Sequence, residues 1–300
     1  MEEKEISSSA KLVKKKRHSI LVVIGVALLC LFGGNLLGSI LLYPIYRLLP
    51  NMDGGTAFLL QYLSFIGIDI FVLVYCALFE KDIFRSFLHP KRGGSAGNTV
   101  KSFALGLLIG FGMNVICILL AWLHGDLHFY AGRFQVFYMI CALICVCIQS
   151  GAEELITRGY MMGALQRRYP CWLAIAVNAL FFAALHLLNP GITVASFLII
   201  VAVALALSLV MYYFGSIWLC IAFHTAWNFT QNFLFGLPNS GIVSESSFLH
   251  LDAASDSLFY DVGFGVEGTL TAVIVIALFA AGVVLIGRKK GPVNITKDFC

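Results

Sequence analysis

The stretch QSGAEELITRGY, Gln149 to Tyr160, decides the fold class of this chain. It places Glu153, Glu154 and Arg158 directly after FQVFYMICALICVCI, a run that is apolar enough to lie in a membrane. A charged side chain at that depth costs several kcal/mol, and such groups persist mainly where they face a protein interior or a water-filled cavity. The stretch therefore predicts a membrane-embedded helical bundle with a polar cavity inside it.

The composition of the whole chain supports this class. Of the 300 residues, 60% are apolar and only 12% are charged, and the mean hydropathy is +0.90. A soluble domain has about 25% charged residues, whereas a helix that crosses a membrane needs a run of about 20 apolar residues. We expect an all-α, polytopic transmembrane helical bundle of about eight helices. The eight apolar runs are 19–46, 57–79, 102–123, 135–166, 171–188, 193–214, 216–236 and 264–287.

The basic residues are divided unevenly between the two sides of such a bundle. Seventeen of the twenty Lys and Arg residues precede the first helix, follow the last, or lie in the loops near 80–101 and 167–168. Only Arg47 and Arg133 lie on the opposite side, where the loop 237–263 contains no basic residue. Loops that are rich in Lys and Arg stay in the cytosol. We therefore expect both termini to be cytosolic, and the short loops favour a bacterial plasma membrane.

The same pattern gives the domain organisation. We expect a basic cytosolic segment at 1–18, one transmembrane domain at 19–290 and a cytosolic tail at 291–300. The first apolar run is longer than the apolar region of a signal peptide and has no clear cleavage site after it, so we expect it to be retained. Membrane lipid is an expected partner, and nucleic acid is not.

The two glutamates are expected to play different parts. Residues four apart share one face of a helix, whereas neighbours differ by about 100°. Glu154 can therefore pair with Arg158, which leaves Glu153 as an unpaired carboxylate. Such a group is suited to take and return a proton. The alternative is a cluster of charges that only holds helices together.

Two later helices carry polar pairs with the same spacing. Phe182 and His186 are four residues apart, and so are His224 and Asn228. Each pair, taken alone, is as compatible with a hydrogen bond between helices as with a functional site. Together with Glu153, however, the two imidazoles and the amide make a set that can activate water and bind an oxyanion.

The chain resembles a known family at these three places. EELITR, FAALH and HTAWN match the E-E-x-x-x-R, F-x-x-x-H and H-x-x-x-N motifs of the CAAX protease and bacteriocin-processing family, often called CPBP or Abi, which includes the type II CAAX prenyl endopeptidases. The motifs occur in the family's order, each on its own predicted helix, within about residues 100–236. Each motif is short, but the ordered set in a polytopic protein is specific.

The resemblance implies an intramembrane endopeptidase that cuts a peptide or a membrane-anchored protein substrate. It implies that Glu153, assisted by His186, activates water, and that His224 and Asn228 stabilise the oxyanion. The supporting residues would be Glu154, Arg158 and Phe182. We expect no cofactor. Members of the family have also been described as metallopeptidases, so a zinc ion held by Glu153, His186 and His224 is the alternative, although the chain has no H-E-x-x-H pair.

Two other functions remain open at this point. One is an ion- or proton-coupled transporter in which Glu153, Glu154 and Arg158 line the path, although inverted repeats and broken helices are not evident. The other is a non-catalytic protein that resembles bacteriocin-immunity proteins. The sequence assigns no role to Asp69, a second acid in an apolar run, or to the loop 237–263.

Overall fold

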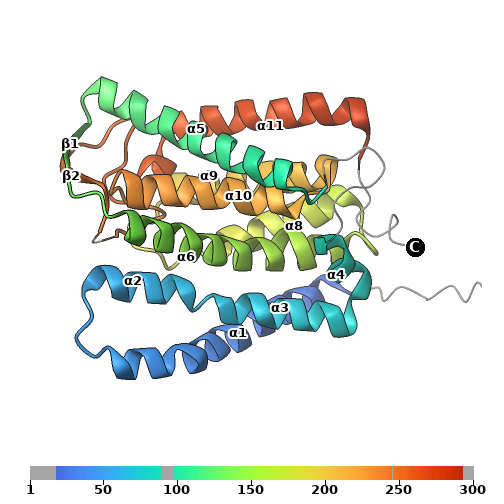
Figure 1. Cartoon of the computed structure of the whole chain (residues 1–300). Helices are drawn as coiled ribbons and strands as arrows, with labels where there is room; N and C mark the ends of the chain where they lie inside the picture. The colour runs from blue at the N-terminus through green and yellow to red at the C-terminus, as the bar shows by residue number, and fades with distance from the viewer. Residues whose placement is uncertain (1–17, 89–96, 245, 293–300) are drawn as a thin grey trace, which may run out of the picture.

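A computed structural model describes residues 18–88, 97–244 and 246–292, and within them it forms a bundle of long helices (Figure 1). Six of these helices are long and apolar enough to cross a membrane, which makes the chain a multi-pass integral membrane protein. In chain order the α-helices are α1 (Ile20–Leu48), α2 (Gly54–Leu63), α3 (Ile66–Phe79), α4 (Lys81–Leu88), α5 (Val100–His124), α6 (Val136–Glu154), α7 (Met162–Leu165), α8 (Cys171–Ala184), α9 (Val194–Phe214), α10 (Ile217–Phe229) and α11 (Leu270–Lys290).

All eight predicted apolar runs contain α-helix, but three of them are broken or pass into a π-helix. The second is broken into α2 and α3 at Ser64 and Phe65. The fourth passes from α6 through a π-helix, η1 (Leu155–Met161), into α7, and the seventh ends in a second π-helix, η2 (Thr230–Leu234). The fifth, α8, ends four residues earlier than the predicted boundary at 188.

Polar residues cap the helices where the chain enters a span. Ser19, Thr99, Thr193 and Thr269 precede α1, α5, α9 and α11, and each side chain accepts a hydrogen bond from the backbone N–H three residues later. Gly215 ends α9 with a positive φ of 59°. Because lipid cannot hydrogen-bond the free backbone groups at helix ends, these caps stabilise the spans.

Small residues allow the closest helix contacts. Gly38 of α1 lies against Ser64 and Gly67 at the break between α2 and α3, and a methyl group on Gly38 would collide with the Ser64 carbonyl oxygen. Gly110 of α5 lies in the same way against the backbone of Phe223 in α10. Glycine is favoured at such crossings because helices in lipid associate mainly through close backbone packing.

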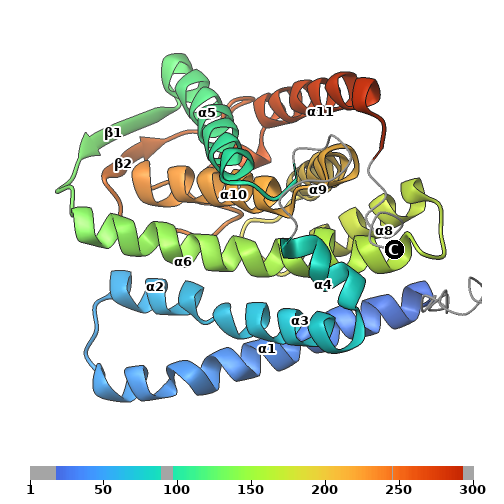
Figure 2. The same ribbon diagram turned by 45° about the vertical axis from the view of Figure 1, so that its right-hand side comes forward.

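Helix α6 lies in the middle of the bundle. In both ribbon views it runs between the layer of α1, α2 and α3 on one side and α5 and α10 on the other (Figures 1 and 2). It packs against α10, α2 and α3. All seven residues of η1, which follows it directly, are buried. Arg158 of η1, and Glu154 directly before η1, therefore lie inside the protein.

A small antiparallel sheet covers one end of the bundle. Strand β1 (Leu127–Ala131) pairs with β2 (Leu249–Ala254), with an irregularity between His128 and Phe129. The short 3₁₀ helix η3 (Val266–Gly268) then leads into α11. The fold class is all-α as expected, and this small sheet is an addition that the sequence did not predict; it joins the predicted loop 237–263 to the segment after α5.

The ends of the helices agree with the division of basic residues. The start of α1, helix α4, the turn between α7 and α8, and the end of α11 lie at one end of the bundle, and the α1–α2 connection and the sheet lie at the other (Figure 1). The basic residues of 1–17 and 293–300 and those near Lys91 lie outside the described residues. The cytosolic location of the first end remains a prediction.

Candidate active site

The predicted ion pair between Glu154 and Arg158 is present. Arg158 Nη1 donates to Glu154 Oε1 at 2.9 Å, and both side chains are completely buried. The guanidinium also lies over the ring of Phe182, with 4.4 Å from Cζ to the ring centroid. The charge of Glu154 is therefore compensated inside the bundle, and Phe182 packs on the partner that compensates it.

Glu154 makes a second contact that the sequence did not predict. The same oxygen, Oε1, lies 3.0 Å from Nδ1 of His224 on α10. A carboxylate only accepts hydrogen bonds, so Nδ1 of His224 carries the proton of this contact. Nε2, the other ring nitrogen, is then directed to Glu153 and lies 3.8 Å from its Oε2 atom.

Glu153 has a different environment from its neighbour. Its side chain remains 15% exposed, and Oε1 accepts a hydrogen bond of 2.5 Å from Nε2 of Gln149. Its second oxygen, Oε2, accepts no hydrogen bond from any residue in the described ranges. The sequence did not single out Gln149, although its position four residues before Glu153 places both on one helix face.

Asn228 is connected to the Glu153 carboxylate through Gln149. Its Nδ2 atom donates to Gln149 Oε1 over 3.4 Å, a long hydrogen bond. Its Oδ1 atom accepts from Asn239, which lies in the predicted outer loop. The H-x-x-x-N pair on α10 thus approaches both glutamates, His224 through its imidazole and Asn228 through the amide of Gln149.

His186 lies beyond the end of α8, but its ring still packs against that of Phe182, with 4.9 Å between the ring centroids. Because α8 ends at Ala184, His186 lies in the turn that follows. Its Nδ1 atom is 2.9 Å from the carbonyl oxygen of Phe182, so this nitrogen donates and Nε2 is left as an acceptor. The residues that the structure describes include no ion pair between His186 and either glutamate.

One cavity joins the predicted residues. It has a volume of about 510 Å³. Its polar lining includes Gln149, Glu153, His186, Asn189, His224, Asn228, Asn239, Ser240 and Glu267. Its apolar lining includes Leu28, Leu31 and Phe32 of α1 and Ile199, Ile200, Val203 and Leu207 of α9. A polar reaction site and an apolar surface thus share one space, an arrangement common in ligand sites.

The three residues of the alternative zinc site do not form a metal-binding group. Across the described ranges, no three His, Cys, Asp or Glu side chains are placed so that they could hold one ion. Nδ1 of His224 is directed to Glu154 and Nδ1 of His186 to a backbone carbonyl, and His186 is not grouped with the other two. The donors as they stand therefore do not fit a preformed zinc site.

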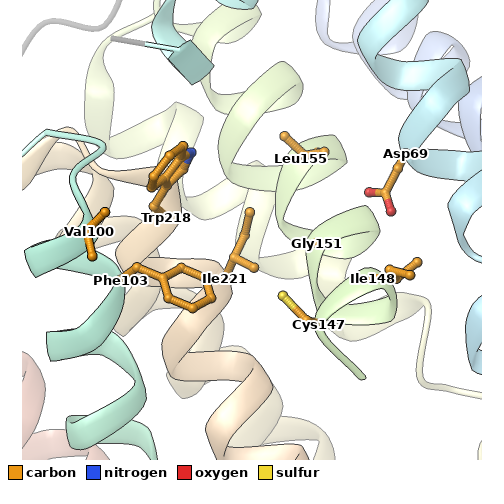
Figure 3. A pocket seen from close by; sticks show the side chains of 9 residues that line it. All are labelled: Asp69, Val100, Phe103, Cys147, Ile148, Gly151, Leu155, Trp218 and Ile221. Atoms are coloured by element: carbon orange, nitrogen blue, oxygen red, sulfur yellow. The ribbon is translucent and has the colours of Figure 1, made fainter. Parts of the chain in front are cut away.

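A second cavity of about 490 Å³ lies on another face of α6 (Figure 3). It is lined by Cys147, Ile148 and Gly151 of α6, by apolar residues of α5 and α10, and by Asp69 of α3, which points toward Gly151. Asp69 is thus separated from the catalytic candidates by α6 itself. Its Oδ1 atom accepts no hydrogen bond within the described part of the chain.

The fold and the site together define a multi-pass membrane protein with a cavity lined by polar and charged side chains. Residues 132–230 match the family model described as type II CAAX prenyl endopeptidase Rce1-like. This match confirms the family that the three motifs indicate, and it covers all of them. The family implies protease activity and a peptide or protein substrate in a membrane. No curated protein matches the chain.

Proposed function

We propose that this protein is an intramembrane endopeptidase in which Glu153 activates the attacking water. The observation that carries the proposal is the placement of Glu153 Oε2, which accepts no hydrogen bond from the described residues and lies 3.8 Å from His224 Nε2 beside the cavity. A water bound there has a carboxylate that can accept its proton. Nε2 of His186, in the same cavity, assists as a second acceptor.

His224 and Asn228 stabilise the oxyanion. The carboxylates of Glu153 and Glu154 and the guanidinium of Arg158 together carry one net negative charge. A protonated His224 makes this group of four side chains neutral, and its Nε2–H can then donate a hydrogen bond to the oxyanion. Glu154, bonded to Nδ1, stabilises that protonated ring. Asn228 Nδ2 supplies the second donor. Donors that are fixed before the reaction and directed at developing charge contribute strongly to catalysis.

The proton balance closes without another group. Water loses a proton to Glu153 as its oxygen bonds to the carbonyl carbon, and the carbonyl oxygen takes the negative charge. The intermediate then collapses, the C–N bond breaks, and Glu153 returns the proton to the leaving amine. The products are a carboxylic acid and an amine.

The shape of the cavity suits a substrate that is partly apolar. Leu28 and Leu31 of α1 and Ile199 and Val203 of α9 form an apolar surface opposite the polar residues. A peptide with a lipid or hydrophobic anchor buries that anchor here while its amide reaches Glu153. The transporter alternative is less well supported, because Glu154 and Arg158 are completely buried and are not among the residues that line the cavity.

The test uses purified protein in proteoliposomes with two peptides of one sequence that ends in a CAAX motif, one with a prenylated cysteine and one without. We expect cleavage of at least one peptide by the parent protein and almost none by Glu153→Gln. Asp69→Asn is the matched control, because Asp69 is also an intramembrane acid. Proton flux that Glu153→Gln abolishes, without cleavage of either peptide, would overturn the proposal.

We also propose that both termini face the cytosol, in a bacterial plasma membrane. The proposal rests on the seventeen basic residues at one side of the bundle against two at the other. Single-cysteine variants labelled with a membrane-impermeant reagent test the orientation. Position 250, in β2, should be labelled only from outside, and labelling only from the cytosolic side would contradict this topology.

A further inference from the structure

Glu267 of η3 is a buried carboxylate with four hydrogen-bond donors. Oε1 accepts from Trp227 Nε1 at 2.8 Å and from Asn239 Nδ2 at 3.1 Å. Oε2 accepts from the backbone N–H and the hydroxyl of Ser240, each at 2.7 Å. The residue is 9% exposed, and the described chain offers it no ion-pair partner. The donors alone stabilise its charge.

This carboxylate fixes the orientation of the Asn239 amide. A carboxylate can only accept, so Asn239 must present its amino group, not its oxygen, to Glu267. The same amino group also donates to Oδ1 of Asn228 at 3.1 Å. Asn228 therefore has its oxygen occupied, and its own amino group is directed away from Asn239.

Further hydrogen bonds connect the Asn228 amide to Glu153 in the reaction site. Asn228 Nδ2 donates to Gln149 Oε1, and Gln149 Nε2 donates to Glu153 Oε1. Three amides in a row thus connect the carboxylate of Glu267 to that of Glu153, and each amide orientation follows from the one before it. If the Asn228 amide were inverted, its oxygen would face the cavity, where it would repel an oxyanion.

We propose that Glu267 and Asn239 are positioning residues that hold the Asn228 amide with its N–H group toward the oxyanion. The inference rests on the proposed function, since it takes Asn228 as an oxyanion donor. Both residues lie after residue 230, outside the segment that matches the family model. The predicted outer loop and the short helix η3 thus contribute to the site through a chain of hydrogen bonds.

The test is a double-mutant cycle on peptide cleavage in proteoliposomes. Asn239→Ala should lower kcat by roughly 10- to 100-fold with little change in KM, because a donor misplaced by about 1 Å can cost about 10²-fold. In the Asn228→Ala background the same substitution should cost nothing further. Asn232→Ala is the matched control, since Asn232 is also buried but, among the described residues, its side chain donates to the carbonyl oxygens of Leu237 and Ile242 and to no member of the amide chain.

Each outcome has one meaning. Losses that multiply in the double variant would overturn the positioning role, as would an Asn232→Ala loss equal to that of Asn239→Ala. Full activity of Asn228→Ala would refute the oxyanion assignment instead, which is a failure of the proposed function. Thermal unfolding in detergent checks that each variant folds. If Asn239→Ala does not fold, Glu267→Gln, which keeps the side-chain volume, takes its place in the cycle.

Discussion

Two cavities of similar size lie on nearly opposite faces of α6, and each is lined by an intramembrane carboxylate. Glu153 in the first accepts from Gln149 and lies beside the ring of His224. Asp69 in the second faces Gly151 and apolar side chains (Figure 3). The comparison teaches that depth and charge do not by themselves make a reaction site. Donors and a second titratable group beside the carboxylate distinguish the first cavity from the second.

The largest expected effect is the loss of cleavage when the first cavity is altered. Glu153→Gln, His186→Ala and His224→Ala should each lower kcat by about 10⁴-fold or more, and combining them should add little, because residues that act as a unit are not additive. Steady-state cleavage of the better CAAX peptide measures this. Losses that multiply across the three positions would show that the groups act separately.

A second prediction separates the two neighbouring glutamates by stability. Glu154→Ala leaves Arg158 buried without its partner, which should cost about 3–5 kcal/mol in free energy of unfolding. Glu153→Gln retains the hydrogen bond with Gln149 in a cavity that is partly exposed, so it should be nearly neutral. Thermal unfolding in detergent gives the comparison, and equal stability of the two variants would refute the assignment of roles.

Asn228→Ala should have a smaller effect on activity than the loss of Glu153. Removal of one oxyanion donor typically costs about 10²- to 10³-fold in kcat, and His224 remains as the other donor. The variant should therefore keep measurable cleavage with a similar KM. Activity as low as that of Glu153→Gln would indicate that Asn228 does more than donate one hydrogen bond.

The smallest effect is expected in the second cavity. Asp69→Asn keeps the size of the side chain, and Asp69 makes no hydrogen bond or ion pair with a candidate catalytic residue in the described structure. Cleavage by this variant should stay within about twofold of the parent. A loss above tenfold would show that Asp69 affects cleavage, so that the two cavities on α6 do not act independently.

Local patterns explain why so much of the fold was predictable. Each membrane span must form its own backbone hydrogen bonds, so an apolar run of sufficient length is a helix whatever surrounds it. The Glu154–Arg158 pair follows from the helix period alone. The family motifs identified His186, His224 and Asn228, and the structure places all three around one cavity.

The features that the sequence did not predict depend on contacts between distant residues. The contact of Glu154 with His224 spans 70 positions, and that of Trp227 with Glu267 spans 40. No local spacing encodes these contacts. The pairing of β1 with β2 is also not predicted by the sequence, because it joins residues that are far apart in the chain, such as Ala131 and Leu249. The break at Ser64 packs closely against Gly38 of another helix.

The short length of α8 has a consequence for the surrounding lipid. Its 14 residues extend only about 21 Å, whereas the hydrocarbon layer is about 30 Å thick. A bilayer that meets a short apolar helix thins locally, which brings the membrane–water interface toward the end of the helix. That end is where the chain turns at His186, so hydration of the reaction site should depend on acyl-chain length. Thinner membranes are then expected to favour turnover.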